Sequence, residues 1–569
     1  MKQNNKAKRT LAAVSALTLI CGSLAACSSA KPQETEAPKA TEAVKATEAA
    51  KATEAAKATE APVATESAEY VPTYPIVDEK ITVTGLVVGA DTSVSDSRIV
   101  WDKVEEVTGI DIEWINIDQE ALSTYLAGGE WPDFFHCALD AGTVNDYGVL
   151  GGRFVNYLEY LDVMPNLVKT FEDYPLTLAA STQLNGEIYN LFQVAGGTST
   201  STVTRPHVRM DVLNAAGITE LPTTVDELYD QLVVLKEKNG QPGLLLDTGT
   251  TTGIVPMLFS AFGTQTILGF DDDGAGNVIY TRTSEQMKHY YEYLNKLYEE
   301  GLMNQEWLTL DNTAKNQLVK SGIIAYPTQA AAQSLTEEDL GGNWDNLGCL
   351  APFTSKYADD QVLSGYIDYR TVGGMYINKD SAYVEEICKM LDICFAEEEV
   401  VPGSGLIGTA FTMGLEGVDY IVNEDGTYAQ IVPENFEGAF TTYQNQLLRW
   451  QDIGRKDRLG LAVTSTAGNA QARQKGYVAN VIPYQKKDHI FPTGVLKFTD
   501  DEQYVIDNKY ADIDKYVLEM EAKFISGAAD IDSEWDAYVS NCEKMGINDV
   551  LEVYQTAYDR WNTALASLN

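Results

Sequence analysis

From about residue 80 onward, short apolar runs alternate with segments that have the apolar spacing of a helix. Ile81–Val88 predicts a buried strand. Residues 99–107 then place their apolar side chains on one side of a helix, which Gly109 ends. Ile110–Ile117 alternates as a second strand, and Asp133-Phe134-Phe135 begins a third. Strand–helix–strand units of this length predict an α/β fold with a mostly parallel sheet.

The loop after the third predicted strand is a candidate binding site. Ligands of open parallel sheets bind beyond the carboxyl ends of the strands. That loop runs through His136, Asp140 and Asp146. Its polar side chains therefore count as candidate ligand contacts.

Three later helices are predicted from capping boxes, in which side chains satisfy free backbone donors at the helix start. The boxes begin at Thr224, Thr283 and Thr499. Behind the last two boxes, apolar stripes run up to Gly301 and Gly527. The stripes predict core packing rather than a cofactor site, and they consist of Met287, Tyr290, Tyr291, Leu294, Leu297 and Tyr298, followed in the C-terminal helix by Ile513, Val517, Met520 and Phe524.

The first 26 residues have the order of a secretory signal. Four basic residues precede an apolar run from Leu11 to Ile20, which is about half of the roughly 20 residues that a membrane span needs. Leu24-Ala25-Ala26-Cys27 follows, which is the pattern of a bacterial lipobox. We expect Cys27 to carry diacylglycerol and to begin the mature protein; an ordinary cleavage site with a chance cysteine is the alternative. A lipid anchor of this kind would hold the protein on the outer face of the cell membrane.

Residues 27–75 read as a flexible linker. From Lys39 the sequence Lys-Ala-Thr-Glu-Ala recurs every six residues, which matches neither a helix nor a heptad. The repeats lack aromatic and large aliphatic residues, so they have no means of burying a core.

Composition narrows the function classes. After the signal, 37 Lys and Arg stand against 83 Asp and Glu, a net charge of −46 that disfavours nucleic acid as a partner. About 495 folded residues predict at least two lobes. The mature chain has five cysteines besides Cys27 and no CxxC pair, and we expect all five to be small buried side chains.

No motif for catalysis, metal or cofactor binding stands out. The four histidines lack metal-ligand spacing, and no nucleophile elbow, Walker loop or Rossmann fingerprint occurs. Two calcium-like runs, 271–277 and 423–426, miss required EF-hand positions and read as hairpin turns. We expect no cofactor and no metal, including at 236–243, which holds a single carboxylate.

A series of ordered motifs runs along the folded part of the chain. They include Leu126–Asp133, Asn185–Tyr189, Arg209–Leu213, Pro222–Leu228, Leu297–Leu302, Gly414–Tyr420, Phe524–Gly527 and Tyr554–Arg560. Taken together, these motifs resemble the lipid-anchored, carbohydrate-type extracellular solute-binding proteins of ABC importers, in the long-chain branch of Gram-positive bacteria. The resemblance extends from about Ile81 to Trp561.

The resemblance implies a two-lobe, type II periplasmic-binding-protein-like fold with the ligand in a cleft between lobes joined by a hinge. Lobe 1 would hold residues 76–193 and 370–480, and lobe 2 would hold 194–369 and 481–569. The hinge crossings would then lie near Gln193, Tyr369 and Val481. Hinge closure around the ligand would present it to the membrane permease.

The ligand expected on this basis is a neutral oligosaccharide. Few bases fall in the segments that should line the cleft (Arg205, Arg209 and Arg370), whereas carboxylate ligands usually need converging arginines. Tyr and Trp are plentiful and suit stacking on sugar rings. By position, the candidate ligand contacts are His136, Asp140, Gln193, Tyr326, Gln329, Tyr366, Tyr369 and Arg370.

We expect a monomer that is not an enzyme. Two alternatives stay open at this point. One is a cell-surface glycan-degrading enzyme, because a chain with 83 acidic residues always offers a pair of carboxylates for hydrolysis. The other is a sensor or adhesin that uses the same fold without a permease.

Overall fold

The computed structural model describes residues 70–194, 206–246, 254–264, 269–361, 363–364, 369–424, 428–437, 440–450, 453–455, 469–486 and 491–567. The predicted signal, Cys27 and the repeats lie outside these residues. Ala68–Asn569 form one compact unit. Within it, the hydrophobic clusters define two α/β lobes.

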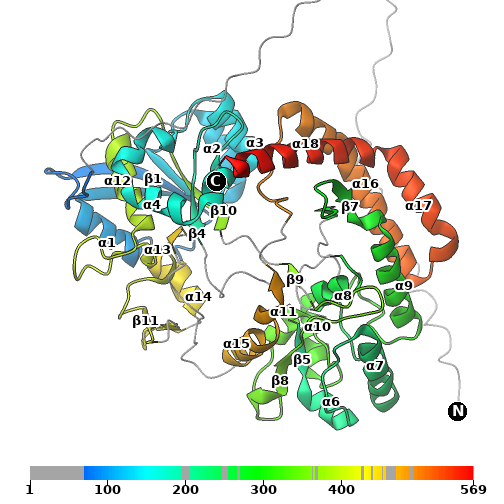
Figure 1. The fold of residues 1–569 in the computed structure, drawn as a ribbon. Coiled ribbons are helices and arrows are strands. Elements are labelled where there is room, and N and C mark those ends of the chain that lie inside the picture. Colours follow the sequence, from blue (N-terminus) through cyan, green and yellow to red (C-terminus); the bar gives the residue numbers. More distant parts are fainter. Residues whose placement is uncertain are drawn as a thin grey trace, which may run out of the picture. The chain divides into compact units, whose positions relative to one another are not determined.

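The first lobe is built on a six-stranded sheet (Figure 1). The strand order is β13-β4-β10-β3-β1-β2. β1, β2 and β3 are parallel to one another, and β10 is antiparallel to β3 and β4. The bounds are β1 Ile81–Val88, β2 Ile110–Ile117, β3 Phe134–Cys137, β4 Leu191–Val194, β10 Tyr369–Ile377 and β13 Gly454–Arg455.

Helices cover this sheet because each presents an apolar face to it. One cluster packs Trp101 and Val104 of the first helix against strand residues such as Val83 and Met375. The helices of this lobe are α1 Ile99–Thr108, α2 Leu122–Gly128, α3 Ala141–Val144, α4 Pro165–Asp173, α5 Pro175–Ser181, α12 Val384–Asp392, α13 Ala410–Met413 and α14 Phe440–Tyr443. The short 3-10 and π-helical turns are η1 Gln119–Ala121, η2 Asn145–Leu150, η3 Tyr157–Val163, η6 Ile393–Phe395 and η7 Gln444–Leu448, and the hairpin β11 Tyr420–Val422 with β12 Tyr428–Gln430 completes the lobe.

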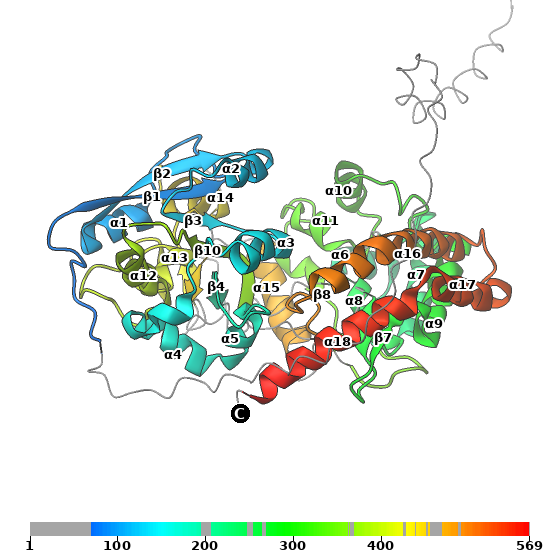
Figure 2. The same cartoon turned by 90° about the horizontal axis from the view of Figure 1, so that it is seen from above.

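The second lobe is mainly helical (Figures 1 and 2). Its helices are α6 Met210–Ala216, α7 Val225–Asn239, α8 Val255–Ala261, α9 Glu285–Glu299, α10 Asn312–Lys320, α11 Gln329–Gln333, α15 Asn469–Asn480, α16 Asp500–Ser526, α17 Ile531–Met545 and α18 Ile547–Ala566. Its strands form the pairs β5 His207–Arg209 with β8 Leu347–Cys349, β6 Phe270–Asp272 with β7 Val278–Tyr280, and β9 Leu363–Ser364 with β14 Gln485–Lys486. The turns η4 Thr281–Thr283, η5 Trp344–Asn346 and η8 Ile482–Tyr484 connect them.

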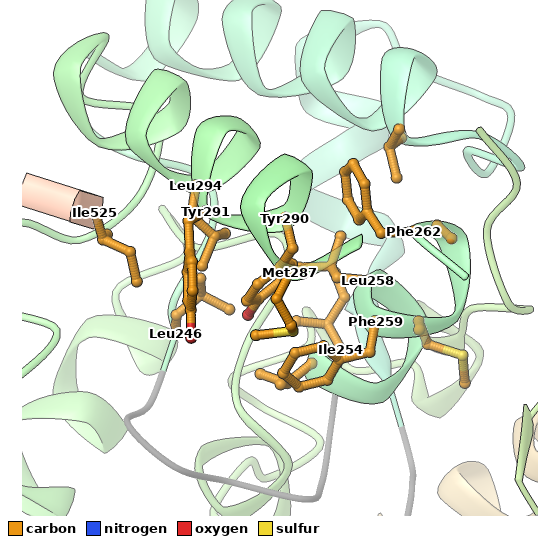
Figure 3. Packing of buried hydrophobic residues seen from close by; sticks show 14 of the residues in the cluster. Leu246, Ile254, Leu258, Phe259, Phe262, Met287, Tyr290, Tyr291, Leu294 and Ile525 are labelled. Atoms are coloured by element: carbon orange, nitrogen blue, oxygen red, sulfur yellow. The ribbon is translucent and has the colours of Figure 1, made fainter. Parts of the chain in front are cut away.

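The core of the second lobe confirms the predicted helix stripes. Met287, Tyr290, Tyr291 and Leu294 of α9 pack against residues of α8 and against Ile525 of α16 (Figure 3). The predicted stripe of α16, from Ile513 to Phe524, is also buried there. Figure 3 shows Met287 and Tyr290 pointing toward Leu258 and Phe259 of α8, and Tyr291 and Leu294 lying on the side of Ile525.

Two of the three predicted capping boxes form. Thr224 and Thr499 each exchange hydrogen bonds with the glutamate three residues later. The prediction at Thr283 is wrong, because the adjacent Ser284 caps α9 by accepting from the amide of Met287. A capping box then needs Glu or Gln at position 287, where the chain has Met.

The apolar run just before Tyr326, residues 322–325, forms no regular strand, although hydrogen bonds join this part of the chain to neighbouring segments. The amide of Arg209 donates to the carbonyl of Ala325 (2.8 Å), and the amide of Leu245 donates to the carbonyl of Tyr326 (2.9 Å). Ile324 and Ala325 are buried, and Tyr326 pairs with Leu244 through an isolated bridge rather than a continuous ladder.

A segment that precedes the sheet, residues 70–77, packs on the first lobe. Tyr74, Ile76 and Val77 contact its main hydrophobic cluster. The amide of Ile76 donates to the carbonyl of Thr108 at the end of α1 (2.8 Å). The ammonium of Lys389, on α12, lies 5.5 Å from the ring centroid of Tyr70. The predicted linker, residues 27–75, is therefore too long at its end, because residues 70–75 lie on the folded part. We call residues 70–77 the N-terminal strap.

Two smaller predictions are confirmed. The run at 271–277 lies in the hairpin β6–β7. The run at 423–426 begins directly after β11, which pairs antiparallel with β12, and its residues 425 and 426 lie outside the described residues. The five cysteines that were predicted to be buried are buried: Cys137, Cys349, Cys388, Cys394 and Cys542.

Candidate ligand-binding edge of the sheet

Most of the predicted ligand contacts in the first lobe come to one edge of its sheet. β4 runs parallel to β3, because both are antiparallel to β10, and β13 runs parallel to β4. The carboxyl ends of β1, β2, β3, β4 and β13 therefore meet at one edge, where β10 begins. We call this the carboxyl edge, and it is where ligands of such sheets bind.

The chain leaves the first lobe from three neighbouring strands of this edge. After β4 the next described element is β5, before β10 comes β9, and after β13 comes α15, all three of the second lobe. The first two crossings between the lobes lie beside Gln193 and Tyr369, as predicted from the resemblance. The predicted third crossing near Val481 is corrected, because the change lies between Arg455 and Asn469.

The reason for the correction is the packing of α15. Tyr477 of this helix and the following Val481 belong to the main cluster of the second lobe. A Cβ atom added at Gly476 would lie 2.6 Å from the Cβ of Cys349, so α15 approaches β8 closely. Residues 469–480 thus belong to the second lobe and not to the first. That these connections act as a hinge stays a prediction.

Asp140 follows β3 at the carboxyl edge and caps the short helix α3. Its carboxylate accepts from the amide and the hydroxyl of Thr143 (2.8 and 2.9 Å). The side chain is exposed. Asp140 therefore remains available for a ligand hydroxyl while it holds its loop.

Gln193 is buried near the end of β4. Its amide donates to the hydroxyl of Thr412 (3.3 Å), whose carbonyl accepts from Gln444 (2.6 Å) and Arg449 (3.1 Å). The chain between α13 and the end of η7 is thereby joined to β4. Gln193 thus has a clear structural role at the edge.

The imidazole of His136 does not lie in a loop, contrary to the sequence-based prediction. His136 belongs to β3 and is fully buried. Its ring packs 5.7 Å from Trp101 and 6.4 Å from Trp114, measured between centroids. β3 extends two residues beyond Phe135, because His136 pairs with Met375 and Cys137 with Gly374 of β10.

Tyr326 is likewise buried, in the core of the second lobe. Its ring has no exposed surface, and its hydroxyl donates to the side-chain oxygen of Gln231. Burial raises the pKa of this phenol. Neither Tyr326 nor His136 offers a ring face to a sugar in this structure, so neither is among the contacts proposed below.

The remaining predicted residues are placed only in part. Gln329 is half-buried in the first turn of α11. Tyr369 and Arg370 begin β10, where they pair with Val194 and Gln193. Tyr366 and Cys27 lie outside the described residues.

The loop after β1 is a further part of the carboxyl edge, and the sequence did not single out its partners. The amide of Gln446, in η7, donates to the carboxylate of Asp91 (2.9 Å) and the hydroxyl of Ser93 (3.2 Å). Asn116, near the end of β2, exchanges two hydrogen bonds with the backbone of Ala90 (3.2 and 3.1 Å). No local signal marks Gln446, which is 355 residues from Asp91 in the chain.

Asp91 is held ionised by its neighbours. Hydrogen bonds from the hydroxyl and the amide of Ser93, and then from Gln446, lower the pKa of this exposed carboxyl to about 2. The loop therefore presents a carboxylate at neutral pH, and the lowered pKa keeps it ionised in mild acid as well.

The described parts of the chain show neither a metal-binding cluster nor a membrane-spanning helix. No three His, Cys, Asp or Glu side chains come together there in a way that could hold a metal ion. None of the helices in those parts is both long and apolar enough to cross a membrane.

The fold is that of two-lobe extracellular solute-binding proteins. An HMO-binding, ABC-transporter-associated solute-binding protein from Bifidobacterium longum infantis ATCC 15697 superposes with a TM-score of 0.68 at 19% identity, over 85% of this chain and 99% of that one. FusA of S. pneumoniae in complex with kestose gives a TM-score of 0.65 at 19% identity, over 85% of this chain and 100% of that one.

Sequence comparison gives the family. Residues 90–400 match the family model described as bacterial extracellular solute-binding protein, and the chain belongs to this family. It is 23% identical over 525 residues to the fructooligosaccharide ABC transporter substrate-binding protein FusA of Streptococcus pneumoniae serotype 4 (86% of this chain, 92% of FusA). It is 22% identical over 501 residues to lipoprotein LipO of Bacillus subtilis strain 168 (82% of this chain, 90% of LipO).

Proposed function

We propose that this protein is the substrate-binding lipoprotein of an ABC transporter, and that it captures a neutral oligosaccharide outside the membrane for delivery to permease subunits. The observation that carries the proposal is membership of the solute-binding family over residues 90–400, joined to a carboxyl edge that carries exposed polar groups. FusA, a relative along most of the chain, is named for fructooligosaccharide transport.

The choice of a neutral ligand rests on charge. The mature chain carries −46, which repels anionic glycans unless arginines converge on them. Arg209 is buried in the second lobe, where its guanidinium donates to Asp211 and to the carbonyl of Val319 (2.6 Å). It is therefore not available to a carboxylate ligand.

Anchoring and mechanism are parts of the same proposal. Cys27 carries the lipid, and residues 28–69 connect it to the folded part. Ligand binding closes the two lobes by bending the three connections at the carboxyl edge. The closed form is the one that the permease recognises, and the ligand leaves unchanged, because the protein is not an enzyme.

Calorimetry against a glycan panel tests the ligand class. The panel holds neutral oligosaccharides such as kestose, nystose, maltotriose and cellotriose, together with a uronate tetramer and a short peptide. We expect a neutral member to bind and to be recovered intact by mass spectrometry. Tight binding of the uronate or the peptide alone would refute the neutral ligand, and recovery of cleaved sugar would favour a hydrolase.

Asp140→Ala tests whether the carboxyl edge binds the ligand. Loss of a charged hydrogen bond to a sugar hydroxyl should weaken binding by roughly 10- to 100-fold. The control is Asp311→Ala, because Asp311 is an exposed cap of α10 with the same 2.8 Å bond to a backbone amide. Equal affinity of the two variants would exclude Asp140 as a contact.

A further inference from the structure

Arg98 is a buried charge that connects two distant segments of the carboxyl edge. It is the last residue of the loop after β1, and only 1% of it is exposed. Its guanidinium donates to the backbone carbonyls of Ser97 (2.9 Å) and Asn445 (3.0 Å), and to those of Ser95 and Asp91. Three of these acceptors belong to the loop, and the fourth belongs to η7, 347 residues later.

An aromatic ring completes the surroundings of this guanidinium. Its central carbon lies 3.8 Å from the ring centroid of Trp450, which follows η7. Trp450 in turn meets Trp114 of β2 edge to face, at 5.6 Å between centroids. The ring face attracts the cation, so it adds to the stabilisation that the four carbonyls give.

Burial of the charge fixes the loop. A buried cation costs several kcal/mol unless acceptors surround it. Any movement of the loop or of η7 away from Arg98 would leave the charge with fewer acceptors. The buried guanidinium of Arg98 therefore holds the loop after β1 and η7 in one arrangement.

The exposed side of the same two segments carries groups suited to sugar hydroxyls. The carboxylate of Asp91, the hydroxyl of Ser93 and the amide of Gln446 meet there through the hydrogen bonds described above. A carboxylate only accepts, whereas a hydroxyl and a primary amide both donate and accept. We call these three residues the polar rim.

We propose that Arg98 is a positioning residue for ligand binding, which holds the loop after β1 and η7 together so that the polar rim binds sugar hydroxyls. The inference rests on the proposed function, since it takes the ligand to be an oligosaccharide. A preformed rim loses little conformational freedom on binding, and this favours affinity.

The chemistry of the two cations makes Arg98→Lys the informative variant. Lysine keeps the charge, but its ammonium has three donors at one point, whereas the planar guanidinium has five donors in a fork. A lysine therefore cannot reach four carbonyls and stack on Trp450 at once. The variant removes the connection between the segments and leaves the charge.

The matched control is Arg209→Lys. Arg209 is 2% exposed and also donates to backbone carbonyls, but it lies in the second lobe. A third variant, Gln446→Ala, changes a half-buried residue of the rim whose side chain bonds only to the exposed groups of Asp91 and Ser93, so it tests the rim without removing a buried charge. All three are compared with the wild type in two measurements.

The first measurement is amide hydrogen exchange without ligand. Arg98→Lys should raise exchange in residues 89–98 and 440–450 together, and Arg209→Lys should change neither segment. The second is calorimetry with the neutral oligosaccharide of the panel that binds the wild type best. Arg98→Lys and Gln446→Ala should each weaken binding about tenfold or more, as expected for the loss of a hydrogen bond to a charged or oriented group, whereas Arg209→Lys should not.

Each contrary result overturns a different part of the role proposed for Arg98. Unchanged exchange, or a rise in one segment alone, overturns the connection through Arg98. Raised exchange with wild-type affinity in both Arg98→Lys and Gln446→Ala overturns the rim as a ligand site. A wild type that binds no glycan overturns the proposed function and the rim with it, while the exchange measurement still decides whether Arg98 joins the two segments.

Discussion

Asp392 should make the first lobe less stable as the pH rises from about 4 to 7. It ends α12, is 2% exposed, and caps a different helix, α4. Its carboxylate accepts from the amides of Asn166 (3.2 Å) and Leu167 (2.8 Å) and from the side chain of Asn166 (2.8 Å). Burial raises the pKa of this carboxyl from 3.8 to about 7, against these three hydrogen bonds.

The sign follows from proton binding. Between the two pKa values the folded protein holds a proton on Asp392 that the unfolded chain has lost, so unfolding becomes easier as the pH rises. Each pH unit in that window is worth about 1.4 kcal/mol, and the window of about three units gives a total on the order of 4 kcal/mol. The contribution of the protonated Asp392 to the free energy of unfolding is complete below pH 4 and absent above about pH 7.

The variant Asp392→Asn isolates this contribution, because asparagine has nearly the same shape and does not titrate. Urea unfolding at half-unit steps from pH 4 to pH 8, followed by circular dichroism, gives both free energies of unfolding. Other carboxylates cancel in the difference between wild type and variant. That difference should fall by up to about 4 kcal/mol across the range and then level off.

The control is Asp530→Asn. Asp530 is exposed and caps α17, and the hydrogen bonds from Ser533 lower its pKa. Its contribution is lost only as the pH falls through that lowered value, so the control difference should be flat from pH 4 to 8. A flat difference for Asp392→Asn would refute the reasoning.

Three more outcomes are expected. Cys27→Ala should release the folded protein from membranes, and mass spectrometry of the membrane-bound wild type should show a diacylglyceryl Cys27; a different first residue would contradict the anchor. Gly454→Ala should lower stability by more than about 3 kcal/mol in thermal melts, because its Cβ would lie 1.9 Å from the carbonyl oxygen of Cys394, whereas Gly274→Ala, at a similar positive φ with open space, should cost only about 1 kcal/mol. The five described cysteines are buried, so Ellman's reagent should modify them only after unfolding, and reaction of any of them in the native protein would contradict the burial.

Local signals predicted the beginning of the sheet well. β1 and β2 have the predicted bounds, and Gly109 ends α1 in the left-handed conformation that glycine adopts easily. These elements depend on neighbouring residues, whose pattern is complete in the sequence. The same holds for the caps at Thr224 and Thr499.

What the sequence could not predict depends on distant partners. His136 looked like a loop residue because imidazole is polar, yet Trp101 and Trp114 bury it. α15 went to the wrong lobe because its contact with Cys349 leaves no mark in its own sequence. Arg98 gave no signal because its η7 acceptor is 347 residues away.

The N-terminal strap has a mechanical consequence. Its residues, from Tyr70 to Val77, are docked on α1 and α12 of the first lobe. A pulling force that travels along the preceding chain enters the molecule at this lobe. Under the anchoring and lobe closure proposed above, the second lobe would rotate without doing work against the tether. Tension at the membrane would then be decoupled from occupancy of the proposed sugar site.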